Sequence, residues 1–120
     1  MEKIIFTSYT RKNGHNEFLE WFQRLPIKDQ AKLQDIILRI EEHGLLVAQR
    51  MLWVKKIEGE NNLYEIRSKQ SSNIQRALYF HVENGYYVIT HGFTKKTSKT
   101  PKSEIDHAIL IREEWRIENE

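Results

Sequence analysis

The feature that most constrains the fold is the dipeptide Asn84-Gly85, which lies between two runs rich in β-branched and aromatic residues. An Asn-Gly pair supplies the positive φ angles that a tight hairpin turn needs. Residues 74–82 and 86–93 are therefore predicted to form neighbouring antiparallel strands. Just upstream, residues 63–67 (LYEIR) also alternate between polar and apolar side chains, which predicts a third strand beside the first two.

The remaining elements follow from the spacing of apolar residues. Strands are predicted at 3–9 and 52–57, and amphipathic helices at about 16–25, 27–43 and 101–117. Thr100-Pro101 predicts the start of the last helix, with the threonine as N-cap and the proline as first residue. This order predicts an α+β fold in which the N-terminal strand and three to four C-terminal strands form a small antiparallel sheet with an αα-hairpin and a C-terminal helix. We expect the helices to cover one face and leave the other free to bind.

Composition restricts the classes of function. With 120 residues, the chain is expected to be a single domain, residues 1–120. The chain has no cysteine, and its five histidines show no paired spacing, so no metal or cofactor is expected. Neither a signal peptide nor an apolar run of the ~20 residues needed to span a bilayer is present. We therefore expect a cytoplasmic protein without membrane association.

Positive charge is concentrated in residues 63–102. Seven lysines and arginines there oppose two glutamates, a local balance of +5, so the rest of the chain carries −3 of the total +2. Such asymmetry is typical of a surface that meets a phosphate backbone, although a solvated face without function has the same composition.

The predicted strands bring candidate catalytic groups together. Across the hairpin, His91 should lie opposite Ala77 or Leu78, about one residue pair from Arg76. Cleavage of RNA without metal needs a base for the 2′-OH, cations for the phosphorane and an acid for the 5′ oxygen. His91, Glu65 or a lysine could be the base, although a lone strand histidine is more often structural and Glu65 could simply pair with an arginine.

Three segments also resemble a known family. They are Leu63–Arg67, Arg76–Phe80 and the run HGFTKKTSKTPKSEI from His91 to Ile105. Together they resemble the phage-derived Gp49-like branch of the RelE/HigB toxins, in the RelE/ParE superfamily of type II toxin–antitoxin systems. The resemblance extends from about Ile4 to Trp115.

The resemblance implies a microbial-RNase-like RelE fold and a toxin that cleaves translated mRNA on the ribosome, a metal-independent endoribonuclease that arrests growth. It also implies a helix-turn-helix, HigA-like antitoxin, with operator DNA bound only through the complex of the two proteins. The predicted catalytic residues are Arg67, Arg76, His91, Lys95 and Lys96. The predicted RNA contacts are Lys55, Lys56, Lys69, Lys99 and Lys102.

The resemblance implies roles for some of these residues. Arg76 is expected to hold the scissile phosphate with support from Arg67, and His91 is the leading candidate for the base. Some superfamily members have a lysine where Glu65 stands, and some have a tyrosine after the last strand that this chain lacks. Two alternatives stay open: a toxin of the same fold that inhibits DNA gyrase by protein contact, and a non-toxic nucleic-acid-binding domain.

Overall fold

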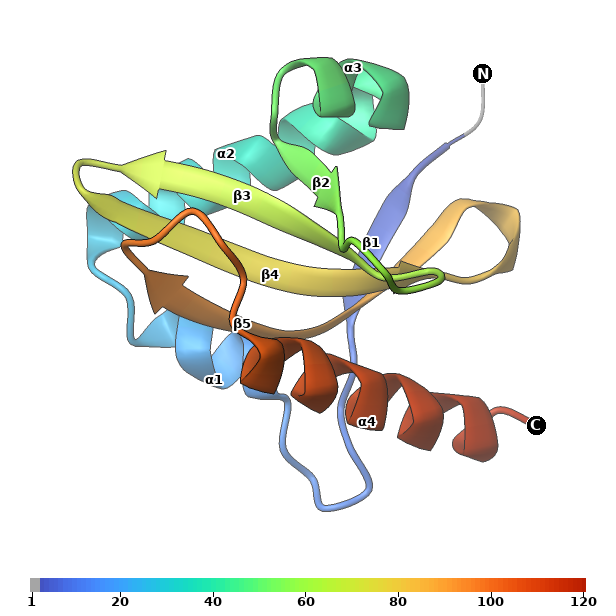
Figure 1. The fold of residues 1–120 in the computed structure, drawn as a ribbon. Helices are drawn as coiled ribbons and strands as arrows, with labels where there is room; N and C mark the ends of the chain where they lie inside the picture. Colours follow the sequence, from blue (N-terminus) through green and yellow to red (C-terminus); the bar gives the residue numbers. More distant parts are fainter. Residues whose placement is uncertain (1–2) are drawn as a thin grey trace.

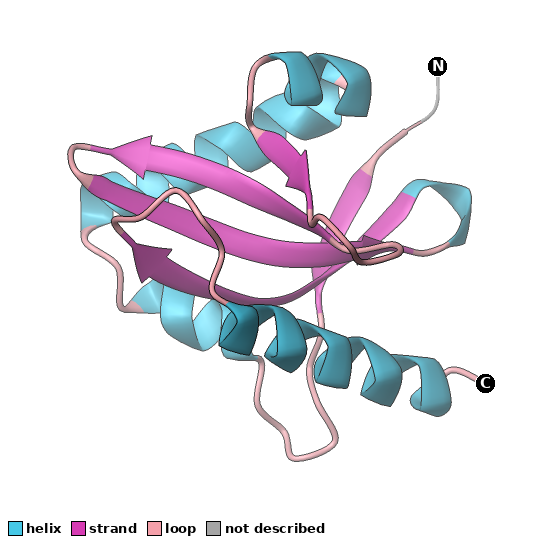
Figure 2. Ribbon diagram, viewed as in Figure 1, coloured by secondary structure: helices cyan, strands magenta, loops and turns pink. Residues whose placement is uncertain are grey.

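The computed structural model describes residues 3–120 as one five-stranded sheet with helices on both sides (Figures 1 and 2). The strands lie in the order β1-β5-β4-β3-β2. In chain order the elements are β1 (Ile5–Ser8), α1 (Glu17–Gln23), α2 (Ile27–His43), α3 (Leu45–Arg50), β2 (Val54–Lys56), β3 (Tyr64–Gln70), β4 (Asn73–His81), the 3₁₀ turn η1 (Glu83–Gly85), β5 (Tyr86–Lys95) and α4 (Lys102–Glu118). The predicted α+β class is confirmed.

The central hairpin forms where the sequence predicts it. Asn84 and Gly85 have φ angles of 64° and 79°, and β4 and β5 pair in antiparallel fashion on either side of them. Leu78 lies opposite His91, as expected from counting back from the turn. Arg76 lies opposite Phe93, so an aromatic ring separates the arginine from the histidine along this face of the sheet.

The sheet is mixed, which corrects the prediction of a wholly antiparallel one. β1 pairs in parallel with β5, while the other three pairs of neighbouring strands are antiparallel. The parallel pairing is possible because the long segment through α1, α2 and α3 separates β1 from the rest of the sheet and allows the chain to return in the same direction.

One face of the sheet packs against α1 and α2, as their apolar spacing predicts. Leu33, Ile36 and Ile40 of α2 form a core with sheet residues that include Ile66 and Tyr79. At Gly92 of β5 the Trp21 ring lies so close that an added Cβ would stand 2.2 Å from its carbon atoms. A glycine is therefore required for the close approach of α1 to the sheet.

The opposite face is not free, which is the second correction to the predicted architecture. α4 crosses it, lying in front of the sheet in Figure 1 while α2 lies behind. Ala108 packs with Leu78 and Phe93, and Ile111 packs with Phe80. Successive residues of β4 place apolar side chains on both faces of the sheet, so both faces must be buried against other elements. Only the part of this face beyond the start of α4 remains for a functional site.

Candidate active site between β2, β3 and the loop before α4

Arg76 is fully buried beneath the loop of residues 96–101, which folds back over β3 and β4 (Figure 1). Its Nη1 donates to the Lys99 carbonyl at 3.1 Å, and its Nη2 donates to the carbonyl of Thr97. The guanidinium also lies 5.9 Å from the centre of the Phe93 ring. Burial lowers the pKa of Arg76, an effect that nearby Glu65 partly opposes. Arg76 thus fixes the loop and does not face open solvent.

Two other residues of the same loop, Ser98 and Thr100, contact Arg67 and Glu65 of β3. The Thr100 hydroxyl donates to Glu65 Oε2 at 2.5 Å, and the Ser98 carbonyl accepts from Arg67 Nη2 at 3.0 Å. Arg67 Nε also lies 3.5 Å from Glu65 Oε1. The predicted N-cap role of Thr100 is therefore wrong, because its hydroxyl is used by Glu65. Two arginines and one carboxylate are joined through four consecutive loop residues.

A cavity of about 450 Å³ opens between the loop, β2 and β3. Its lining combines four cationic side chains with two carboxylates: Lys55, Lys56, Arg67 and Lys99 with Glu58 and Glu65. Glu65 is only 1% exposed, whereas both β2 lysines are exposed to solvent. A buried carboxylate below a ring of cations can accept a proton while the cations hold a polyanionic ligand above it.

His91 belongs to a different cluster, underneath α4. Its ring is 4% exposed; Nε2 lies 3.1 Å from Glu104 Oε1, and Nδ1 lies 3.1 Å from Thr90 Oγ1. The ring of His107 is 4.8 Å away, and its Nε2 lies 2.7 Å from Glu17 Oε1. This network joins β5, α4 and α1. His91 does not line the cavity that contains Glu65, and both of its ring nitrogens already have partners.

This position makes stability depend on pH. Burial is the main cause that lowers the pKa of His91 below its ordinary value of 6.5; His107 adds to the effect, whereas Glu104 and Glu17 oppose it. As pH falls, the unfolded chain therefore binds this proton before the folded chain does. The free energy of unfolding should be at its full value above pH 6.5 and decrease as pH falls through the lower pKa of the folded state.

Urea unfolding at about pH 7.5 and about pH 5.5 measures this effect. His91→Gln should remove most of the difference between the two midpoints. The strand residue His81 is exposed, so His81→Gln is the matched control and should preserve the difference. Glu17 should not contribute to the difference between the two unfolding midpoints, because its pKa is lowered from 4.5 and so lies below both pH values. Equal midpoints for the wild type at both pH values would contradict the prediction.

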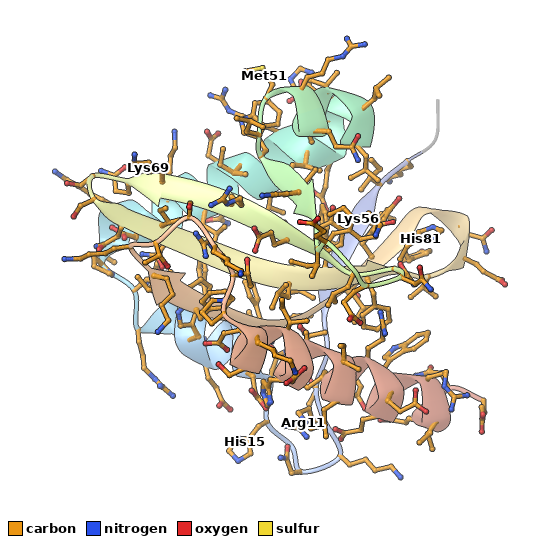
Figure 3. The ribbon with its side chains drawn as sticks, in the orientation of Figure 1. Arg11, His15, Met51, Lys56, Lys69 and His81 are labelled. Carbon is orange, nitrogen blue, oxygen red and sulfur yellow. The ribbon has the colours of Figure 1, made fainter. Side chains whose placement is uncertain are left out.

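The other predicted residues are spread over the surface around the loop. Lys95 and Lys96 are exposed, and neither lines the Glu65 cavity. Lys102 is exposed and pairs with Asp106 at 3.0 Å. Lys56 and Lys69 lie towards opposite ends of the β2–β3 region in Figure 3, and Lys56 Nζ donates to the Glu60 carbonyl at 2.7 Å. The structure therefore brings Lys55, Lys56, Lys99 and Arg67 together and leaves the other lysines apart.

Two side-chain contacts around the candidate site could not be predicted from the spacing of residues in the sequence. One is the contact of Thr100 with Glu65, whose only sequence signal, a threonine before a proline, also fits a helix cap. The other is the pairing of Glu104 with His91 across two elements.

Among residues 3–120 no helix is long and apolar enough to cross a membrane. In the same part of the chain no group of three histidine or carboxylate side chains is placed to hold a metal ion.

The mixed sheet, with α1 and α2 on one face and α4 on the other, is an α+β arrangement similar to the RelE fold. The archaeal RelE–RelB complex from Pyrococcus horikoshii OT3 contains a chain that superposes with a TM-score of 0.53 and 16% sequence identity, covering 82% of this chain and 100% of that chain. The family described as phage derived protein Gp49-like matches residues 20–112. The chain therefore belongs to the Gp49-like family. Comparison with curated protein sequences gives no match.

Proposed function

We propose that this protein is the toxin of a type II toxin–antitoxin system and cleaves translated mRNA on the ribosome without a metal ion. The observation that carries the proposal is the cavity in which the buried Glu65 carboxylate lies below Lys55, Lys56, Arg67 and Lys99. Membership of the Gp49-like family and the RelE fold support it. A helix-turn-helix antitoxin and the ribosome are the partners that we propose with this function, in the cytoplasm.

In the proposed reaction Glu65 takes the proton from the 2′-OH, whose oxygen attacks the adjacent phosphorus. Arg67, held beside the carboxylate by the Ser98 carbonyl, stabilises the negative charge of the phosphorane. The bond to the 5′ oxygen then breaks, and a lysine ammonium group of the cavity protonates that oxygen; we assign this role to Lys99, which lines the cavity with Glu65. The products are a 2′,3′-cyclic phosphate and a 5′-hydroxyl end.

The roles of four predicted catalytic residues change in this proposal. Glu65 replaces His91 as the base, because Glu65 lines the cavity that Arg67 and Lys99 also line, whereas His91 does not. Arg76 is proposed to act by holding the loop that carries Lys99 and Thr100, since its own guanidinium is fully buried. Lys95 and Lys96, also predicted as catalytic, are exposed outside the Glu65 cavity, and we propose that they contact RNA instead.

Primer extension on cellular mRNA after induction tests the function. We expect new 5′ ends inside translated reading frames within minutes of induction, and none when translation initiation on the same message is blocked. Inhibition of DNA gyrase would instead leave mRNA intact and arrest DNA replication. Intact mRNA during growth arrest would therefore refute the proposal, as would tolerance of the gene alone without any effect on growth.

A further inference from the structure

A second groove, of about 350 Å³, lies beside the Glu65 cavity where β2 begins. β2 pairs only as far as Val54 with Ile66, and one more backbone bond joins the Arg67 N–H to the Trp53 carbonyl at 2.8 Å. Beyond this bond the far half of β3 has β4 on one side and no strand on the other. The space is bordered instead by the turn after α3 and by α2. We call it the flanking groove, lined by Lys32, Met51, Leu52, Trp53, Arg67 and Lys69 among others.

Arg67 lies between the flanking groove and the Glu65 cavity, because it lines both. Figure 3 places Lys69 towards the far end of β3 and Met51 at the turn after α3, on two borders of this groove. A nucleic-acid strand that passes over Arg67 could therefore contact the linings of both spaces. The volume lies within the range of about 300–1,000 Å³ that is usual for small-molecule sites.

The charge of the groove favours a polyanion. Among the described residues that line it, Lys32, Arg67 and Lys69 are cationic and no carboxylate is present. These three cations come from α2 and β3, on different sides of the groove, so they can contact successive phosphates of one strand.

Trp53 adds a feature that charge alone would not need. Its ring is partly exposed, rests against the core shared with α2, and lies 6.2 Å from the His43 ring. Leu52 next to it is 75% exposed and has a φ of 61°, a strained angle for a leucine. Exposed apolar side chains and an aromatic ring within a cationic groove are the combination on which unpaired bases stack.

We propose that the flanking groove binds the single-stranded nucleotides next to the scissile phosphate, with Trp53 stacking on a base and Lys32 and Lys69 contacting phosphates. The proposal rests on the proposed function, which it extends by a binding site for flanking mRNA. An acidic peptide is the competing occupant; it would satisfy the lysines but leave the ring and the exposed Leu52 without a role.

NMR of the full chain, uniformly labelled with ¹⁵N so that backbone amides and tryptophan indoles are both observed, tests the proposal with a 2′-O-methyl octaribonucleotide that cannot be cleaved. The chain has three tryptophans, and only Trp53 lines the groove. Its indole signal should shift as RNA is added, whereas that of Trp115, which belongs to α4 and packs against Phe80, should not. Trp53→Ala should weaken binding about tenfold, which is within the range for loss of one stacked base.

Charge reversal supplies a second measurement that does not touch the core. Lys32→Glu should weaken binding of the octaribonucleotide about tenfold at low salt. Lys28→Glu, one turn earlier on α2 and outside the groove, is the matched control and should bind as the wild type does. These variants keep the test decisive if Trp53→Ala alters the fold.

Three outcomes would overturn the proposal. RNA shifts confined to residues around Glu65 would leave the proposed function intact and remove the groove from it. Equal shifts with octaglutamate would assign the groove to an acidic protein partner. Absence of any shift at millimolar RNA would also reject the site, while primer extension would still decide separately whether the protein cleaves mRNA.

Discussion

Glu65→Gln is expected to abolish mRNA cleavage and growth arrest while preserving the fold. The amide has the size of the carboxylate and can still accept a hydrogen bond from Thr100, so the loop should stay in place. It cannot take a proton from the 2′-OH, and loss of a general base costs about 10²- to 10⁴-fold in rate. The measurement is the rate of mRNA cleavage in a translation extract with purified protein.

Glu58→Gln is the matched control for this variant. Glu58 lines the same cavity but is exposed, and it has the same charge as Glu65. A general effect of removing a negative charge from the cavity would appear in both variants, whereas loss of the base would appear only at Glu65. Thermal unfolding should confirm that both variants fold. Wild-type cleavage by Glu65→Gln would show that Glu65 is not the base.

The hairpin and the two helices behind the sheet could be predicted because they depend on local patterns. Asn84 fixes a turn through its own φ angle, and the spacing of Leu33, Ile36 and Ile40 produces an apolar stripe in any helix. The register of His91 followed by counting residues from that turn. Each of these predictions needed only information within a few residues of the chain.

The cover on the second face could not be predicted in the same way. Placing α4 there depends on Ala108 and Ile111 meeting Leu78 and Phe80, contacts between residues far apart in sequence. Parity in β3 indicated that Tyr64 and Ile66 face the core, but the alternate face, with Glu65, was expected to be open. The structure shows that face enclosed by a loop whose composition, rich in lysine and threonine, suggested only an exposed segment.

The candidate site was predicted in its residue types and less well in its arrangement. Charge counting found Arg67 and Lys99, which line the same cavity. The same count gave equal weight to Lys95, which lies outside it. Counting along strands placed His91 near Arg76, but it could not show that the Phe93 ring separates them or that α4 encloses the histidine. Which charged side chains meet in one site depends on their contacts with residues from distant elements, and the sequence pattern does not show those contacts.

Arg76→Ala is expected to abolish growth arrest through loss of the loop. Two carbonyl groups, of Thr97 and Lys99, lose their shared donor, and hydrogen bonds to a charged group contribute about 1.5–3 kcal/mol each. The loop should therefore detach from β4, carry Lys99 and Thr100 away from Glu65, and lower the stability by about 3 kcal/mol. Limited trypsin digestion measures the detachment directly, because cleavage after Lys96 and Lys99 should become faster.

Arg76→Lys separates a positioning role from direct contact with the phosphate. Lysine retains the positive charge but lacks the planar fork that donates to two carbonyls at once. If Arg76 positions the loop, Arg76→Lys should be almost as inactive as Arg76→Ala and equally sensitive to trypsin. If Arg76 instead holds the phosphate by its charge, the lysine variant should keep measurable cleavage, and trypsin sensitivity should not follow activity. Arg24→Ala, at an exposed position next to α1, is the control for removing an arginine and should change neither measurement.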